Sequence, residues 1–184
     1  MSTLDLLTFP LLEGCTHFNQ LELYYLAGGI NLVCFFAPFV VAAKQDHDSH
    51  EISGTLCLGI TILLTVYNIA FNGILGAVIS VAVAFFVFRR KEFAAFGQAD
   101  FLLLGHLYTC YGMDGVGGAI LIVACVVWLL SLAGYLVVMY IRTGVRWRPF
   151  KGMMVPAFPS YVVSMSIMAV LRFFLIKPLF FAGF

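Results

Sequence analysis

Long apolar runs, each close to the length of a membrane crossing, alternate with short polar segments along this 184-residue chain. A helix needs roughly 20 predominantly apolar residues to cross the hydrocarbon core of a bilayer. The pattern predicts six transmembrane helices, at about Leu23–Ala43, Ile52–Phe71, 73–88, Asp100–Tyr111, Val116–Ile141 and Tyr161–Ile176. The fourth is short, and we expect it to recruit part of 93–99 or to be a bent segment supported by its neighbours.

The first residues differ from the rest of the chain. Residues 1–22 mix apolar and acidic side chains, and Pro10 and Gly14 interrupt any long helix there. We therefore expect 1–22 to lie at a membrane surface and 23–184 to form one transmembrane domain. No basic residue precedes Lys44, so the positively charged region that opens a secretory signal is missing, and the first apolar run is expected to stay as a permanent span.

The composition agrees with a membrane protein. Hydrophobic residues make up 62% of the chain and charged residues only 10%, which a soluble domain of this length cannot bury; the predicted class is an all-α integral membrane protein. The five cysteines show no metal-binding spacing and imply neither a metal site nor a disulfide framework. Cys34, Cys57 and Cys125 lie in apolar runs and are expected to act as small hydrophobic residues, whereas Cys15 and Cys110 are expected to be more exposed.

The basic residues predict the orientation. Eight of the ten lie in three loops, which six spans place on one side of the membrane: Lys44, Arg89, Arg90, Lys91, Arg142, Arg146, Arg148 and Lys151. The positive-inside rule makes that side cytoplasmic and puts both termini outside an inner (cytoplasmic) membrane. Because this charge is spread over separate loops, nucleic acid is not an expected partner. Arg172, inside the last span, is expected to face the bundle interior or to extend to the interface.

Two carboxylates fall at one predicted depth. Asp46 follows the cytoplasmic end of the first span, and Asp100 begins the fourth. Two adjacent carboxyl groups tend to share a proton. Such a pair suits hydrolysis of an amide bond, because the charged member takes a proton from water while the protonated member donates to the carbonyl oxygen or the leaving amine. Asp48 is the alternative to Asp46, since the two would exchange places if the predicted end of the first span were in error by two residues.

Four short motifs carry a family resemblance. The run 46–53 resembles the prepilin peptidase pattern of an Asp at the end of the first span with Ile-Pro six residues later, and Gly97-Gln-Ala-Asp100 is similar to that family's Gly-x-Gly-Asp motif. The turn at 112–115 follows the fourth segment at a spacing that resembles the family's. Pro156-Ala-Phe-Pro159 is similar to the Pro-x-x-Pro that family members have before their last span. The resemblance covers the chain from about Leu23 to the last span.

The resemblance implies a function. It implies the Gly-x-Gly-Asp type of aspartic protease fold and a membrane-embedded endopeptidase that removes leader peptides at the cytoplasmic face, with Asp46 and Asp100 as the catalytic pair. The implied partners are a pilin-like precursor, with its leader and hydrophobic helix, and membrane lipid. No cofactor or metal is implied. The cysteine-containing region that accompanies methyltransferase activity in larger members is absent, so the resemblance is to a short, divergent form.

Three residues depart from the family pattern. Ala99 stands where the family has Gly, and a Cβ there would be strained if the position needed a positive φ. Leu102 stands where a Lys commonly follows the second Asp, and Ser53 replaces the Pro of Ile-Pro. The departures at Ala99 and Leu102 favour one alternative, a pseudopeptidase that keeps the fold as a scaffold for pilin-like helices.

Other interpretations of the same residues remain open. Asp46 could be a solvated loop carboxylate, and Asp100 could be a helix N-cap or first-turn carboxylate that complements the helix dipole. The pair could also bind protons or cations in a small transporter. His47 and Glu51 share a helix face at four-residue spacing, which suggests a metal site, but the His-Glu-x-x-His order of a zinc protease is missing.

Overall fold

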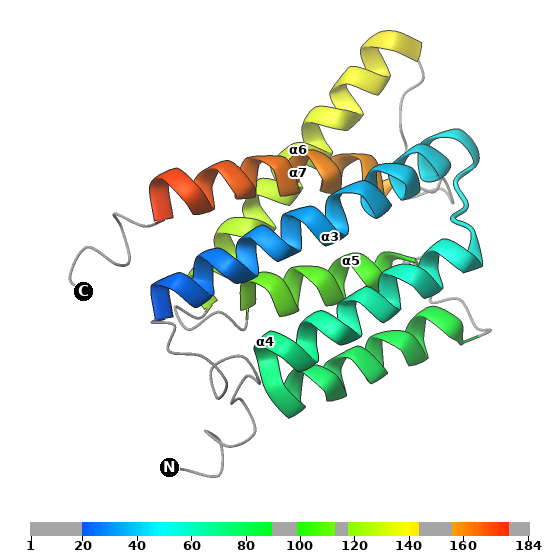
Figure 1. The fold of residues 1–184 in the computed structure, drawn as a ribbon. Coiled ribbons are helices and arrows are strands. Elements are labelled where there is room, and N and C mark those ends of the chain that lie inside the picture. Colours follow the sequence, from blue (N-terminus) through cyan, green and yellow to red (C-terminus); the bar gives the residue numbers. More distant parts are fainter. Residues whose placement is uncertain (1–19, 90–98, 113–117, 144–155, 177–184) are drawn as a thin grey trace.

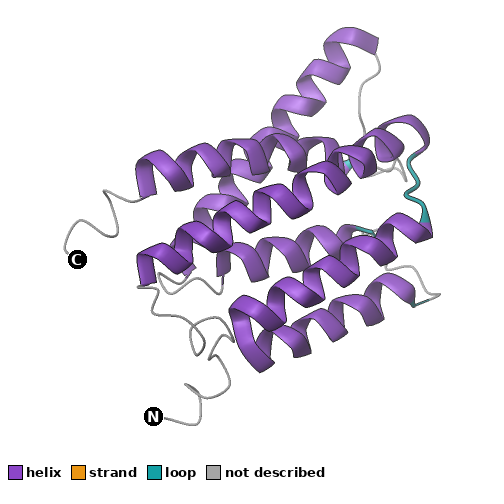
Figure 2. Cartoon of the chain, in the orientation of Figure 1, coloured by secondary structure: helices purple, strands orange, loops and turns teal. Residues whose placement is uncertain are grey.

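The computed structural model describes residues 20–89, 99–112, 118–143 and 156–176. These residues form helices and contain no strand (Figures 1 and 2), which confirms the all-α class. The elements are α3 (Gln20–Ser49), α4 (Gly54–Phe88), α5 (Asp100–Leu107), the π-helical turn η1 (Tyr108–Gly112), α6 (Gly118–Thr143), α7 (Ala157–Leu171) and the π-helical turn η2 (Arg172–Ile176). Within these described ranges, four stretches are long and apolar enough to cross a membrane: Tyr25–Ser49, Gly54–Phe88, Ile120–Arg142 and Ala157–Phe174.

Helix α4 consists of two halves that fold back on each other at Gly73. Gly73 has φ 61° and ψ −150°, a conformation that glycine adopts because it has no Cβ. Figure 1 shows the two halves side by side and antiparallel, and the Asn68 amide donates a hydrogen bond from one half to the Ser80 hydroxyl in the other. The turn predicted at Asn72 and Gly73 is confirmed.

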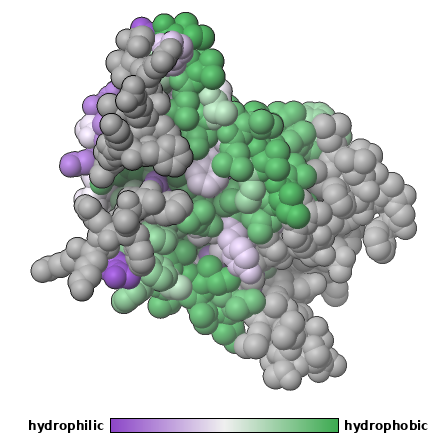
Figure 3. Space-filling view, turned by 180° about the vertical axis from the view of Figure 1, so that it is seen from behind, coloured by the Kyte–Doolittle hydropathy of each residue, from purple (hydrophilic) through white to green (hydrophobic). Residues whose placement is uncertain are grey.

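The helices pack as a bundle with two distinct ends. At one end, which we name the Asp46 end, α3 finishes at Ser49 while α5 begins at Asp100 and α7 begins at Ala157; both ends of α4 also lie there (Figure 1). At the opposite end, the Gly73 end, α3 begins and α7 finishes. Figure 3 shows a mostly hydrophobic surface with the hydrophilic side chains gathered toward the Asp46 end. This distribution fits a bundle whose sides face lipid.

Two helix boundaries differ from the prediction. Helix α3 continues past Ala43 to Ser49, because its polar last turns contact α6 and α7 through His47 and Asp46. Helix α7 begins at Ala157, four residues before the predicted start at Tyr161. Pro159 does not prevent this early start. The backbone N–H groups in the first turn of a helix have no partner within the helix, so the N–H that proline lacks is not needed there.

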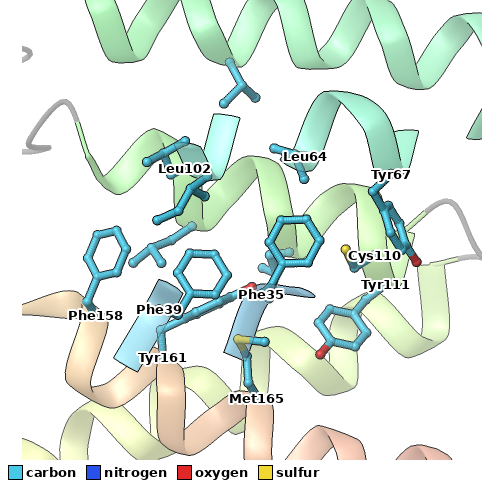
Figure 4. Close-up of a cluster of buried hydrophobic side chains, with 14 of the residues drawn as sticks. Phe35, Phe39, Leu64, Tyr67, Leu102, Cys110, Tyr111, Phe158, Tyr161 and Met165 are labelled. Atoms are coloured by element: carbon cyan, nitrogen blue, oxygen red, sulfur yellow. The ribbon is translucent and has the colours of Figure 1, made fainter. Parts of the chain in front are cut away.

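An aromatic cluster fills the centre of the bundle (Figure 4). Phe35 and Phe39 of α3 are completely buried, and the ring of Phe39 lies 5.9 Å from Phe158 and 5.6 Å from Tyr161 of α7. Phe35 contacts Tyr67 of α4 edge-on at 5.9 Å. Such aromatic pairs each contribute about 0.5–1.5 kcal/mol beyond the area that they bury. The cluster therefore fixes the positions of α3 and α7, the two helices that meet at the Asp46 end.

Candidate active site at the Asp46 end

Asp46 lies on the last turns of α3 and is half-buried. Its Oδ2 accepts a hydrogen bond of 3.0 Å from the backbone N–H of Phe158, the second residue of α7. The carboxylate thus binds the beginning of a helix 112 positions away in the sequence. A negative group at this position complements the partial positive charge of a helix N-terminus. The alternative in which Asp46 is a solvated loop carboxylate is wrong, because Asp46 is helical and bound to α7.

The segment that follows Asp46 turns sharply into α4. His50 has φ 56°, and the side chain of Gln45 accepts a hydrogen bond of 2.9 Å from the backbone N–H of Ser53. The Ser53 hydroxyl in turn accepts the N–H of Leu56 at 3.4 Å and caps α4. A proline at position 53 could make neither bond, since it has no N–H and no hydroxyl. The serine that departs from the family pattern at position 53 therefore has a structural role in this chain.

Asp100 is the first residue of α5 and is half-buried, which places a carboxylate at the N-terminus of that helix, where it is electrostatically favourable. Ala99 precedes it with φ −68° and ψ −24°. Because this φ is negative, the strain expected from a Cβ at position 99 is absent. Leu102 is completely buried, so the lysine that the family commonly has there would point into the packed bundle. An apolar side chain suits this position.

The structure places Asp46 and Asp100 at the same end of the bundle, as the charge distribution predicts (Figure 1). Within the described part of the chain, the Asp46 side chain bonds to the start of α7 and not to Asp100. Asp48 is exposed at the surface of α3. Of the two candidates on α3, Asp46 is therefore the one that faces the neighbouring helices.

His47 points to α6 rather than to a cluster of metal ligands. Its Nδ1 lies 2.7 Å from the hydroxyl of Tyr135, and Glu51 is exposed. Among the described residues, no three side chains of His, Cys, Asp or Glu converge on one point. The relevant contact of His47 is thus the hydrogen bond that joins the end of α3 to α6.

A buried polar network in the bundle centre was missed by the sequence interpretation. His106 of α5 is fully buried and bonds through Nδ1 to the Tyr161 hydroxyl at 2.7 Å and through Nε2 to Asn31 Oδ1 at 2.8 Å. It joins α3, α5 and α7. The signal was present in the sequence, because Asn31 and His106 each interrupt an apolar run, and a polar residue inside a membrane span is rarely without a partner.

Arg172 and Cys110 lie toward the Gly73 end of the bundle, and both are buried. Arg172 is buried, which confirms the interior alternative, and its Nη1 donates to the backbone carbonyl of Cys110 at 3.4 Å. Cys110 itself is completely buried, so its predicted exposure is wrong: η1 extends α5 into the core and carries Cys110 with it. Cys15 and Asp114 lie outside the described residues.

Comparison with known proteins finds no relative: no family model matches the chain, and no curated protein and no solved structure matches it.

Proposed function

We propose that this protein is a membrane-embedded aspartic endopeptidase of the prepilin peptidase type, which cleaves leader peptides at the cytoplasmic face of the inner membrane. Asp46 and Asp100 form its catalytic pair. The observation that carries the proposal is that both carboxylates lie half-buried at the same end of the bundle, on two different helices. A pair that is neither solvated nor deep in hydrocarbon is suited to reach both water and a peptide bond near the membrane surface.

The proposal includes six crossings of the membrane. The fold-back of α4 at Gly73 supports two antiparallel crossings from this one element, and α5 with η1 supplies a further one beside α3, α6 and α7. With this topology both termini lie outside, and the loops rich in Lys and Arg face the cytoplasm. The Asp46 end is then the cytoplasmic end.

The reaction needs the two carboxyl groups in different protonation states. The charged carboxylate takes a proton from the attacking water, and the protonated carboxyl donates its proton to the carbonyl oxygen or to the departing amine. Water first adds to the carbonyl carbon and forms the new C–O bond, and the C–N bond then breaks as the protonated amine leaves. The substrate would be a pilin-like precursor whose hydrophobic helix enters the bilayer beside the bundle and whose leader reaches the Asp46 end. No cofactor takes part in this scheme.

Cleavage of a pilin-like precursor in proteoliposomes tests the proposal. We expect Asp46→Asn and Asp100→Asn each to lower the cleavage rate by at least about 100-fold, because general acid–base catalysis typically contributes that much. The asparagine at position 46 keeps an oxygen that can accept the Phe158 N–H, so the fold should persist. Asp48→Asn is the matched control, since Asp48 is exposed on the same helix, and it should cleave normally. Retained cleavage in both Asp46→Asn and Asp100→Asn would disprove the assignment.

A non-catalytic scaffold is the second candidate, and one observation favours it. The hydrogen bond between Asp46 and Phe158 is a structural use of the carboxylate, and the scaffold needs no other. It predicts that the wild-type protein binds pilin-like helices without cleaving them. A small proton- or cation-coupled transporter is less favoured, because Asp46, Asp48, Glu51 and Asp100 all lie at the Asp46 end, whereas a transport path would need carboxylates spread along its length through the membrane.

A further inference from the structure

The first turn of α7 has no cap of its own. Pro156 occupies the N-cap position with φ −61° and ψ 108°, and no side chain from that position bonds to the helix. Good N-cap residues carry a side-chain oxygen that accepts an N–H of the first turn, which proline cannot do. Pro159, within the same turn, has no N–H. The amides of Ala157 and Phe158 must therefore find an acceptor elsewhere.

Asp46 is that acceptor. Its Oδ2 takes the N–H of Phe158 at 3.0 Å, and the backbone N–H of Ala157 also bonds to its carboxylate. The contact is reinforced from the core side, because the ring of Phe158 is buried against Phe39, two turns before Asp46 on the same helix. The carboxylate and the start of α7 are thus held together by a hydrogen-bonded cap and by an aromatic contact.

This arrangement conflicts with catalysis. A carboxylate that accepts backbone N–H groups points to those donors rather than to a water molecule. Asp46 is directed to α7, and within the described residues it does not bond to Asp100. If the Asp46 side chain turns away from α7 toward Asp100, the Phe158 N–H loses its acceptor.

On the basis of the proposed peptidase function, we propose that the cap formed by Asp46 on α7 is an autoinhibitory contact that holds the enzyme in a resting state. Release of Asp46 is the step that allows the catalytic pair to form, and the missing cap at Pro156 is what makes the resting state favourable. A helix α7 with its own N-cap would compete with Asp46 for the same amides and would shift the protein toward the released state.

Pro156→Ser tests this inference, because position 156 already has the extended backbone of an N-cap and serine supplies the accepting oxygen. Pro156→Ala is the matched control: it removes the same ring but adds no acceptor. We expect precursor cleavage in proteoliposomes to be faster for Pro156→Ser than for Pro156→Ala and for the wild type. Equal or slower cleavage by Pro156→Ser would overturn autoinhibition and would show that the cap instead helps to position Asp46.

A folding measurement separates the cap from the chemistry. Asp46→Ala removes the acceptor and should lower the thermal midpoint of the protein in detergent, and the double variant Asp46→Ala, Pro156→Ser should recover that loss while Asp46→Ala, Pro156→Ala should not. Failure of the serine to restore the midpoint would contradict the cap and with it the inference. A different outcome is that the serine restores the midpoint but neither the wild type nor Pro156→Ser cleaves any precursor. The proposed peptidase function and the autoinhibition would then both be wrong, and only the capping of α7 by Asp46 would be supported.

Discussion

The imidazole Nδ1 of His106 lies 2.7 Å from the hydroxyl of Tyr161, in the fully buried centre of the bundle. Its Nε2 lies 2.8 Å from Oδ1 of Asn31. Because the Asn31 oxygen can only accept, Nε2 donates and Nδ1 accepts the Tyr161 proton, which satisfies a neutral imidazole completely. The His106 side chain thus joins α3, α5 and α7, and both of its ring nitrogens have a hydrogen-bond partner. Such a network specifies one arrangement of helices in a bilayer, where apolar contacts alone discriminate weakly.

His106→Phe should destabilise the protein. Phenylalanine keeps a ring among Phe35 and Phe39, which contact the imidazole at 4.6 and 4.9 Å, but it leaves Asn31 and Tyr161 without their partner. An unsatisfied buried polar group costs about 1–3 kcal/mol, and we expect a loss of that size in the free energy of unfolding, measured by denaturant titration in detergent. Tyr108→Phe is the control, because Tyr108 is on the adjacent turn and exposed. Equal stability of the two variants would contradict the network.

Gly76→Ala should also destabilise the protein, through the hairpin of α4. A Cβ at position 76 would lie 2.6 Å from Asn72 Cβ and 2.9 Å from the backbone oxygen of Asn68, across the Gly73 turn. Overpacking of this kind costs about 1–3 kcal/mol, which unfolding in detergent would measure. Gly59→Ala, in the same helix, has no atom within 4 Å of its new Cβ. Because alanine is the better helix former by about 0.8–1 kcal/mol, that control should be neutral or stabilising; a similar loss in both variants would show that steric contact at Gly76 is not the cause.

Ser53 provides a prediction at a residue that departs from the family pattern. Ser53→Ala removes the cap on the N–H of Leu56 and should lower the free energy of unfolding by about 1 kcal/mol, as loss of a helix cap usually does. Ser53→Pro should lower it further, because it also removes the N–H that donates to Gln45 at 2.9 Å. Thermal unfolding followed by circular dichroism would rank the variants. A proline variant as stable as the wild type would mean that the two bonds contribute little.

The sequence predicted the features that depend on pattern. The apolar runs predicted the all-helical membrane class, and the pair Asn72-Gly73 predicted the turn within α4, because both follow from local rules of hydrophobicity and backbone conformation. The common end of Asp46 and Asp100 was also predicted, since the alternation of spans and basic loops determines which segment ends share a side. These are properties that a reader of one sequence can obtain without knowing how helices pack.

The details of the site depended on contacts between distant segments. Nothing local to Asp46 predicts that its partner is Phe158, because that contact results from the antiparallel packing of α3 on α7 through Phe39. The burial of Cys110 was missed for a similar reason: the segment was predicted to reach Tyr111, but the burial of Cys110 depends on the helices packed around η1, including the contact of Arg172 with its backbone carbonyl. Pro156 and Pro159 did carry a readable signal, since together they leave the start of α7 in need of an outside acceptor.

Leu102→Lys would show how far the resemblance to the family extends. Leu102 lies in the first turns of α5, two residues after Asp100, and is completely buried, so a lysine there would place an ammonium group among apolar side chains. An unpaired buried charge costs several kcal/mol, and we expect a large fall in the thermal midpoint or failure to accumulate in the membrane. Leu102→Met is the control, because volume-conserving swaps cost less than about 1.5 kcal/mol. If the lysine variant were as stable as the methionine variant, its side chain would have to reach water or Asp100 at the Asp46 end, as the family pattern would require.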